Sequence, residues 1–293
     1  MATPRFNWYQ PEKLEEALDL VSAHRTSVRV IAGGTDLLPK LRAGALETQH
    51  LVSINRVAGL NRIDYQDTDG LVIGAGARIS DVGEHPDVRR HYPALAHACS
   101  VMATVQIRNM GTVAGNVANA APSGDTLAPL LAYNASLVLV ERGGRRQVPL
   151  KDFFTGPGST VMEPVEIIEA IRVPTPPQRA GSCYLRVSAR SKVDIAAVGV
   201  AGLISLDLEG RILGVRLALA SVAPTPVRCP EAEEMLVGQV PEEDLIKRAG
   251  AACVRASRPI SDVRASAEYR RLMVQVLAQR VIARCVEQAR GGE

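Results

Sequence analysis

No run of apolar residues in this sequence approaches the roughly 18 residues that a membrane-spanning helix needs, so no membrane span is expected. The N-terminal residues, MATPRFNWYQPEK, lack the apolar segment of a signal peptide, and we therefore expect a cytoplasmic protein. The charges nearly cancel, because 34 Lys and Arg residues face 31 Asp and Glu residues and leave a net charge of +3. Such a small excess does not indicate nucleic-acid binding.

The cysteines and histidines form none of the spacings that bind metals. The five cysteines lie far apart and include no C-x-x-C pair: Cys99, Cys183, Cys229, Cys253 and Cys285. Zinc ribbons, thioredoxin-like redox pairs and cysteine-rich iron–sulfur motifs therefore have no support. The five histidines lack ligand spacing as well, so we expect no metal bound by this chain.

A run of small polar residues spans positions 103–125 and reads ATVQIRNMGTVAGNVANAAPSGD. It holds three glycines and three asparagines, no aromatic residue, and only Arg108 and Asp125 as charged residues. Small side chains let the backbone approach a ligand closely, and nests of backbone N–H groups bind anions such as phosphate. The alternative is a long surface loop, but loops of this length are uncommon in compact domains unless they bind something.

A second glycine-rich turn follows residues 28–32, VRVIA, which we predict to be a short buried strand. The sequence Gly33-Gly34-Thr35-Asp36 comes next, and a helix is expected to begin at residue 37 with Thr35 or Asp36 as its cap. A strand, a glycine turn and a helix start together present free N–H groups to an anion. Taken alone, such a turn is also compatible with a simple tight connection.

Other segments of the first 173 residues show clear periodicity. Helices are predicted over 11–23 and 80–102, the second broken at Pro86 and Pro93, and residues 127–133 form a short apolar segment. Strands are predicted over 50–54, 70–76, 137–141, 147–150 and 166–173. Gly74-Ala75-Gly76 is no dinucleotide fingerprint, because Ile79 stands where the third glycine belongs. The arginines of Arg142-Gly143-Gly144-Arg145-Arg146 are expected to form a solvated hairpin tip, with docking of a partner as the alternative.

The last third of the chain has a different pattern, and Pro174, Pro176 and Pro177 mark the boundary. Strands are predicted over 184–190, 198–208 and 212–220, with the last two paired across a tight turn. Helices follow from residue 230. The final helix is expected to bury an apolar stripe made of Tyr269, Leu272, Met273, Val276, Leu277, Val281 and Ile282.

Considered together, the two glycine-rich turns lie within a larger set of motifs. These are FNWYQPEKLEEALDL at 6–20, IAGGTDLLP at 31–39, TVQIRNMGTVAGNVANAAPSGD at 104–125, EIIEAIRVP at 166–174 and DIA at 194–196. In this order the sequence resembles the FAD-binding medium subunit of the molybdenum hydroxylases, the group of aerobic carbon monoxide dehydrogenase and xanthine dehydrogenase. The resemblance covers essentially the whole chain.

The resemblance implies an α+β fold in which two α/β subdomains clasp FAD and a C-terminal domain holds a small antiparallel sheet and helices. The expected domains are residues 1–176, divided near residue 56 into 1–56 and 57–176, and residues 177–293. It also implies a set of FAD-contacting residues. The first turn would hold the pyrophosphate through backbone N–H groups of Val30, Ile31, Ala32, Gly33, Gly34, Thr35, Asp36 and Leu37.

The other implied contacts lie on the opposite side of the cofactor. Gly111 and Gly115 would approach FAD through their backbone, Thr112 and Asn116 would donate hydrogen bonds, Ser123 and Asp125 would reach its hydroxyls, and Ile168 would contact the flavin region. Met102 stands where xanthine dehydrogenase-like chains pack an aromatic residue, and Arg186 where relatives often carry Lys. Ile195 replaces the aromatic residue of carbon monoxide dehydrogenase-like chains, so it would pack on the flavin without stacking.

The resemblance implies that this chain is an electron-transfer subunit rather than a complete enzyme. Molybdopterin would lie on a large subunit and [2Fe–2S] clusters on a small subunit, in a heterotrimer that would be doubled by symmetry. Electrons would pass from those clusters to FAD and then to an external acceptor. A stand-alone flavin oxidoreductase and an assembly protein without FAD are the alternatives, and the intact glycines of both turns disfavour the second.

Overall fold

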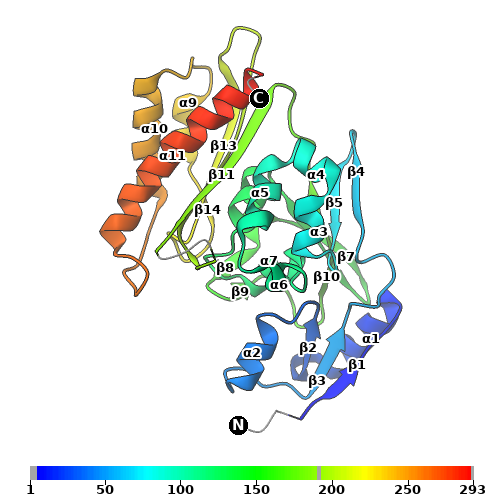
Figure 1. Ribbon diagram of the computed structural model, residues 1–293. Coiled ribbons are helices and arrows are strands. Elements are labelled where there is room, and N and C mark those ends of the chain that lie inside the picture. Colours follow the sequence, from blue (N-terminus) through cyan, green and yellow to red (C-terminus); the bar gives the residue numbers. More distant parts are fainter. Residues whose placement is uncertain (1–4, 190–192, 292–293) are drawn as a thin grey trace.

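The computed structural model describes residues 5–189 and 193–291, and it confirms the predicted α+β fold (Figure 1). Three main sheets follow one another along the chain, with helices packed against them. No helix among the described residues combines the length and apolar character that a membrane crossing requires. The expected division after residue 176 falls between strands of the second and third sheets, and we keep it as a proposal.

The first sheet is parallel and has three strands in the order β1-β3-β2. These strands are β1 (Asn7–Tyr9), β2 (Val28–Ile31) and β3 (His50–Ser53). Two helices connect them, α1 (Leu14–His24), followed by the 3-10 turn η1 (Arg25–Ser27), and α2 (Leu37–Arg42). Helix α2 begins where the sequence predicts. Asp36 occupies the N-cap position, as predicted, although its side chain makes no capping hydrogen bond.

The second sheet is antiparallel, with the order β4-β5-β10-β6-β7. Its strands are β4 (Ile63–Gln66), β5 (Gly70–Gly74), β6 (Ser136–Glu141), β7 (Gly144–Pro149) and β10 (Ile167–Val173). Helices α3 (Ile79–Glu84), α4 (Pro86–His91) and α5 (Pro93–Val101) lie between β5 and β6. Pro86 and Pro93 each occupy a first helical turn, so the predicted helix breaks are confirmed.

The run at 103–125 contains more regular structure than its composition suggests. It forms α6 (Val105–Arg108) and α7 (Val113–Asn119), and α8 (Leu127–Ala132) follows directly. The hydroxyls of Thr104 and Thr112 cap the first two helices by accepting bonds from the backbone N–H groups of Ile107 and Gly115. Threonine therefore appears in this run partly because each short helix needs a cap. The 3-10 turn η2 (Leu150–Asp152) and a small hairpin, β8 (Phe154–Gly156) with β9 (Ser159–Thr160), complete this part.

The arginine-rich hairpin between β6 and β7 is exposed to solvent, as predicted, but its arginines are paired. Only Arg142 and Gly143 form the turn, because β7 already begins at Gly144. Each guanidinium pairs with a carboxylate: Arg142 with Asp19 at 2.9 Å, Arg145 with Glu169 at 2.9 Å and Arg146 with Glu166 at 2.6 Å. The hairpin is therefore tied to its own sheet and to α1.

The third sheet is antiparallel and packs between two layers of helices. Its strands are β11 (Ala180–Ser188), β12 (Ala196–Leu206), β13 (Ile212–Ala220) and β14 (Val227–Arg228), and the predicted pairing of the two strands around residue 210 is confirmed. Residue 190, the expected end of the first strand, lies outside the described residues. Every residue of β12 is buried, because α8 contacts the sheet on one side while α9 (Pro230–Leu236) and α11 (Ala267–Ala289) cover the other. Helix α10 (Glu243–Ala256) packs on α9 and α11. Successive residues such as Leu203 and Ile204 point to opposite faces of the sheet and accordingly belong to different hydrophobic clusters.

The buried stripe of the final helix α11 begins differently from the prediction. Tyr269 and Leu272 are exposed, while Arg270 and Val274 are buried in their place. Leu277, Val281 and Ile282 are buried as predicted, and they continue toward Cys285 and Ala289. The shift arises because the first turn of α11 buries a cation that has specific partners.

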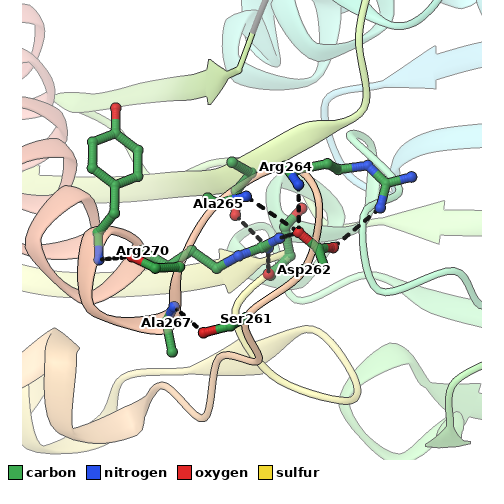
Figure 2. Close-up of polar contacts among 10 residues, drawn as sticks. Ser261, Asp262, Arg264, Ala265, Ala267 and Arg270 are labelled. Carbon is green, nitrogen blue, oxygen red and sulfur yellow. Dashed lines mark hydrogen bonds and ion pairs between the residues drawn. The ribbon is translucent and has the colours of Figure 1, made fainter.

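Arg270 joins the start of α11 to the third sheet. Its Nη1 donates to the carbonyls of Ala197 at 2.8 Å and Ser221 at 2.7 Å, and its Nη2 donates to Asp262 Oδ1 at 2.7 Å. Figure 2 shows the side chains of Arg270 and Arg264 approaching the Asp262 carboxylate from different sides. The same Oδ1 also accepts from the backbone N–H groups of Arg264 and Ala265. One carboxylate thus organises the loop before α11 and one buried guanidinium.

These bonds predict a pH-dependent contribution of Asp262 to stability. The backbone N–H of Arg264 and the Arg270 guanidinium hold the pKa of this carboxyl well below its usual 3.8. The ionised carboxylate therefore stabilises the fold above that pH, and the stabilisation is lost as the pH falls through roughly 5 to 2. In Asp262→Asn, the free energy of unfolding should be lower at pH 7 and should depend less on pH in this window, as measured by urea unfolding.

Asp244→Asn is the matched control, because Asp244 is an exposed carboxylate that pairs with Arg248 on the same helix. Its unfolding should follow the wild-type pH dependence. Equal pH dependence of wild type and Asp262→Asn would show that the Asp262 bonds do not stabilise the ionised form.

Candidate functional site

A cavity of about 580 Å³ opens between the two glycine-rich turns. This volume is typical of sites for small molecules and cofactors, which span roughly 300–1,000 Å³. Thirteen of the predicted contacts line it: Val30, Ile31, Ala32, Gly33, Gly34, Thr35, Asp36, Leu37, Met102, Gly111, Thr112, Gly115 and Asn116. Segments about 80 residues apart in the sequence therefore form one site, and their role as cofactor contacts remains a prediction.

The two turns touch through their backbones. A Cβ atom placed on Gly33 would lie 2.1 Å from the carbonyl oxygen of Met110, which no side chain tolerates without movement of the backbone. A Cβ on Gly111 would lie 3.1 Å from both the Ile107 carbonyl and the Ile79 side chain. Gly34 has a φ of +70°, a conformation that favours glycine. Glycine is therefore required for the two turns to approach each other, whether or not a ligand also approaches their backbone.

The polar side chains on the α7 side have defined partners. Thr112 Oγ1 accepts a hydrogen bond from the Gly115 N–H at 2.9 Å, so its hydroxyl hydrogen is the group that can donate to a ligand. Asn116 Oδ1 accepts from the Thr126 hydroxyl at 2.7 Å, so its Nδ2 is the group that can donate. Both arrangements fit the predicted role of these side chains as donors.

Two basic residues of the cavity were missed from the sequence. Lys40 lies on α2 and donates from Nζ to Asn119 Oδ1 at 2.7 Å, and both residues line the cavity. Arg29 lies on β2 and also lines it. Against the single carboxylate of Asp36 these two cations leave an excess of positive charge in the lining, which suits an anionic group such as pyrophosphate. The signal for Lys40 was its place one turn after the glycine-rich turn, on a helix that the sequence did predict.

Three further predicted contacts line neighbouring cavities. Ser123 and Ile195 line a second cavity of about 320 Å³ beside the C-terminal sheet. Ile168 lines a small cavity of about 100 Å³ that shares Val30, Ala32 and Gly115 with the first one. Met102 is almost completely buried, although it borders the main cavity.

Asp125 and Arg186 bond each other, and neither lines these three cavities. Asp125 Oδ2 accepts from Arg186 Nη1 at 2.7 Å, and Oδ1 accepts from the Tyr184 hydroxyl at 2.7 Å. Burial raises the pKa of the Asp125 carboxyl, while Arg186 and Tyr184 counteract that rise. The pair links the loop before α8 to β11. Contact of Asp125 and Arg186 with a cofactor stays a prediction. The sequence did not indicate that the two side chains also pair with each other.

Removal of the Asp125 carboxylate should destabilise the protein. Both side chains of the pair are nearly inaccessible to solvent, so Asp125→Ala leaves buried donors of Arg186 and Tyr184 without this acceptor. We expect the free energy of unfolding to fall by about 3 kcal/mol, as measured by chemical denaturation. Glu231→Ala removes the exposed ion pair with Arg255 and should leave it nearly unchanged. Wild-type stability of Asp125→Ala would rule out a structural role of the pair.

Comparison with known proteins places this geometry in context. Residues 4–176 match the family described as "FAD binding domain in molybdopterin dehydrogenase", and residues 183–285 match "CO dehydrogenase flavoprotein C-terminal domain". The chain is 33% identical over 286 residues to a putative xanthine dehydrogenase FAD-binding subunit of Escherichia coli K12, covering 97% of each chain. It is 32% identical over 289 residues to the carbon monoxide dehydrogenase medium chain of Hydrogenophaga pseudoflava, covering 97% of this chain and 100% of the other. A solved structure of carbon monoxide dehydrogenase from that organism superposes with a TM-score of 0.93 over 97% of this chain and 98% of the matched chain, at 32% identity.

Proposed function

This chain belongs to the family of FAD-binding medium subunits of the molybdenum hydroxylases, and we propose that it carries electrons from a partner subunit to an external acceptor. In this proposal molybdopterin is held by a large subunit and [2Fe–2S] clusters by a small subunit, in a dimer of heterotrimers. When bound, FAD supplies the redox chemistry, and the residues of this chain set its position and electrostatics. The cytoplasm remains the predicted location.

The observation that carries the proposal is the cavity between the two backbone-contacting turns. A Cβ on Gly115 would meet only the Thr112 hydroxyl, at 2.9 Å, so the lining at this point is backbone that a ligand can approach closely. This cradle, the donors of Thr112 and Asn116, and the charges of Arg29 and Lys40 fit a dinucleotide with a pyrophosphate. Residues 30–37 would bind the pyrophosphate from the other turn.

Ile195 is the residue through which we propose that acceptor access is set. Its side chain is half exposed and lines the second cavity together with Ser123. An aliphatic side chain covers less of a planar ring than an aromatic one does. In the proposed complex, one face of the flavin would therefore stay accessible to the acceptor from this side.

Apolar side chains exposed near the cavity support the proposed assembly with partner subunits. Val105 and Met110 are 56% and 55% exposed at the two ends of the segment containing α6. Trp8 on the edge strand β1 is also exposed. Large exposed apolar side chains are typical of surfaces that another protein covers.

The visible spectrum of the purified assembly tests the proposal. Flavin absorbance with one FAD for each copy of this chain is expected, together with molybdenum, iron and two further chains that copurify. Absence of flavin absorbance after addition of FAD would overturn the FAD assignment. A flavoprotein that purifies as a single chain with its own substrate turnover would instead establish the stand-alone oxidoreductase.

Gly115→Val tests the position of the cofactor. The branched side chain would occupy the cradle and displace the Thr112 hydroxyl, so the dissociation constant for FAD should rise at least tenfold. Gly144→Val is the control, because a Cβ on Gly144 would meet no atom within 4 Å and this residue lies outside the cavity. Fluorescence titration with FAD provides the affinities, and thermal unfolding checks the fold. Stoichiometric FAD in Gly115→Val would show that the cofactor lies elsewhere.

A further inference from the structure

The second cavity, of about 320 Å³, contains an arrangement of charges that FAD binding does not explain. Its walls come from two sides: Pro122, Ser123 and Pro157 precede the C-terminal sheet in the sequence, and the remaining lining residues belong to the C-terminal part. The latter include three arginines, Arg258, Arg264 and Arg270, and one carboxylate, Asp262. The charged side chains in the lining therefore leave an excess of two positive charges.

The donors of two of these arginines are only partly used. Arg258 donates from Nη1 to the carbonyls of Arg255 and Ser257, at 2.6 and 2.7 Å, which fixes its guanidinium while Nε and Nη2 can still donate. Arg264 reaches Asp262 Oδ2 from Nη1 at 3.1 Å. Fixed guanidinium groups with remaining donors are suited to bind phosphate in a bidentate manner.

Two buried polar atoms in the cavity wall have no hydrogen-bond partner among the described residues, namely Ser221 Oγ and Arg270 Nε. Arg270 is only 4% exposed. Buried polar atoms in proteins nearly always have a partner, so both atoms indicate a polar group that completes this site.

Ser221 is held in place by its backbone. Its φ is +67°, its N–H donates to the Pro122 carbonyl at 2.7 Å, and its carbonyl accepts from Arg270. Serine rarely adopts this conformation, and the backbone bonds maintain it. Ser221 thus lines the cavity with a fixed backbone, and its buried hydroxyl has no hydrogen-bond partner in the described part of the chain.

We propose that this second cavity is an oxyanion site that binds a phosphate group. Arg258, Arg264 and Ser221 provide donors from separate segments of the chain, which suits a tetrahedral anion with several oxygens. The remaining wall contains Asp262 and Arg270, which pair with each other, and apolar residues that include Ile195 and Ile260. The cavity is in the size range of small-molecule sites, so it has room for an organic group attached to the phosphate.

This site goes beyond FAD binding, because none of its arginines is among the proposed FAD contacts. Ser123 and Ile195 belong to both sets, so a ligand in this cavity would lie next to the proposed flavin region. FAD must therefore be saturating in a test, which also keeps inorganic phosphate from occupying the first cavity.

The test is calorimetric titration of the purified assembly, saturated with FAD, with inorganic phosphate and with phenyl phosphate at constant ionic strength. Arg258→Gln and Arg264→Gln should each raise the dissociation constant about tenfold or more, since each removes a charge-assisted hydrogen bond. Arg255→Gln is the matched control, because Arg255 lies one turn before Arg258, pairs with Glu231 and does not line the cavity. It should leave the dissociation constant within about twofold of wild type.

The outcomes separate the sources of the phosphate. Equal affinity for both probes identifies free phosphate as the ligand, whereas tighter binding of phenyl phosphate that Ile260→Ala weakens identifies a larger phosphorylated molecule. Both results support the site. Absence of binding at millimolar concentration, or equal effects of Arg255→Gln and Arg258→Gln, would overturn it.

Arg258→Gln is the main variant, because the Arg258 side chain bonds two backbone carbonyls and no carboxylate of the described residues, whereas Arg264→Gln also removes a bond to Asp262. If the chain does not bind FAD, the proposed function fails. The same titrations on FAD-free protein then still report on this site through their dependence on Arg258, which is not among the residues that line the first cavity.

Discussion

The contact between the two glycine-rich turns is the constraint on which the site depends. Gly33 packs so closely on the Met110 carbonyl that even one added carbon atom would require the backbones to separate. This contact brings the parallel first sheet against the segment that contains α6 and α7, and it creates the cavity between them. The glycines are therefore structural residues as well as proposed cofactor contacts. Loss of FAD in a glycine variant would need a stability measurement before it could be assigned to the cofactor.

Two ion pairs hold neighbouring segments against the third sheet. Asp125 with Arg186 joins the loop before α8 to β11, and Asp262 with Arg270 joins the start of α11 to the third sheet. Both arginines are buried and have several partners, so their bonds select one arrangement of the surrounding loops. The cavity with Arg258 and Arg264 lies beside the second pair. The same geometry that anchors α11 thus also positions donors toward the proposed oxyanion site.

Local signals in the sequence predicted most of the elements, and they failed where partners are distant. Pro86 and Pro93 begin α4 and α5, because the fixed backbone angle of proline suits a first helical turn and cannot continue the preceding helix. The strands around residue 210 pair across a short turn. Helical spacing predicts that Tyr269 is buried, yet it is exposed and the neighbouring Arg270 is buried instead. Arg270 is buried because its partners lie on β12, at the end of β13 and in the preceding loop. The cavity residues of both turns followed from motif order. The Asp125–Arg186 pair, 61 residues apart, had no local signal.

The complete burial of α8 has a consequence for synthesis of the chain. All six of its residues are buried, and part of that cover comes from β12 and β13, which follow it by some 64 to 93 residues along the sequence. A ribosome would therefore present this apolar helix before the strands that shield it have emerged. Until then the nascent chain carries an uncovered hydrophobic segment of the kind that chaperones bind. The N-terminal part, which holds the proposed cofactor site, consequently completes its core only when the C-terminal sheet has been made.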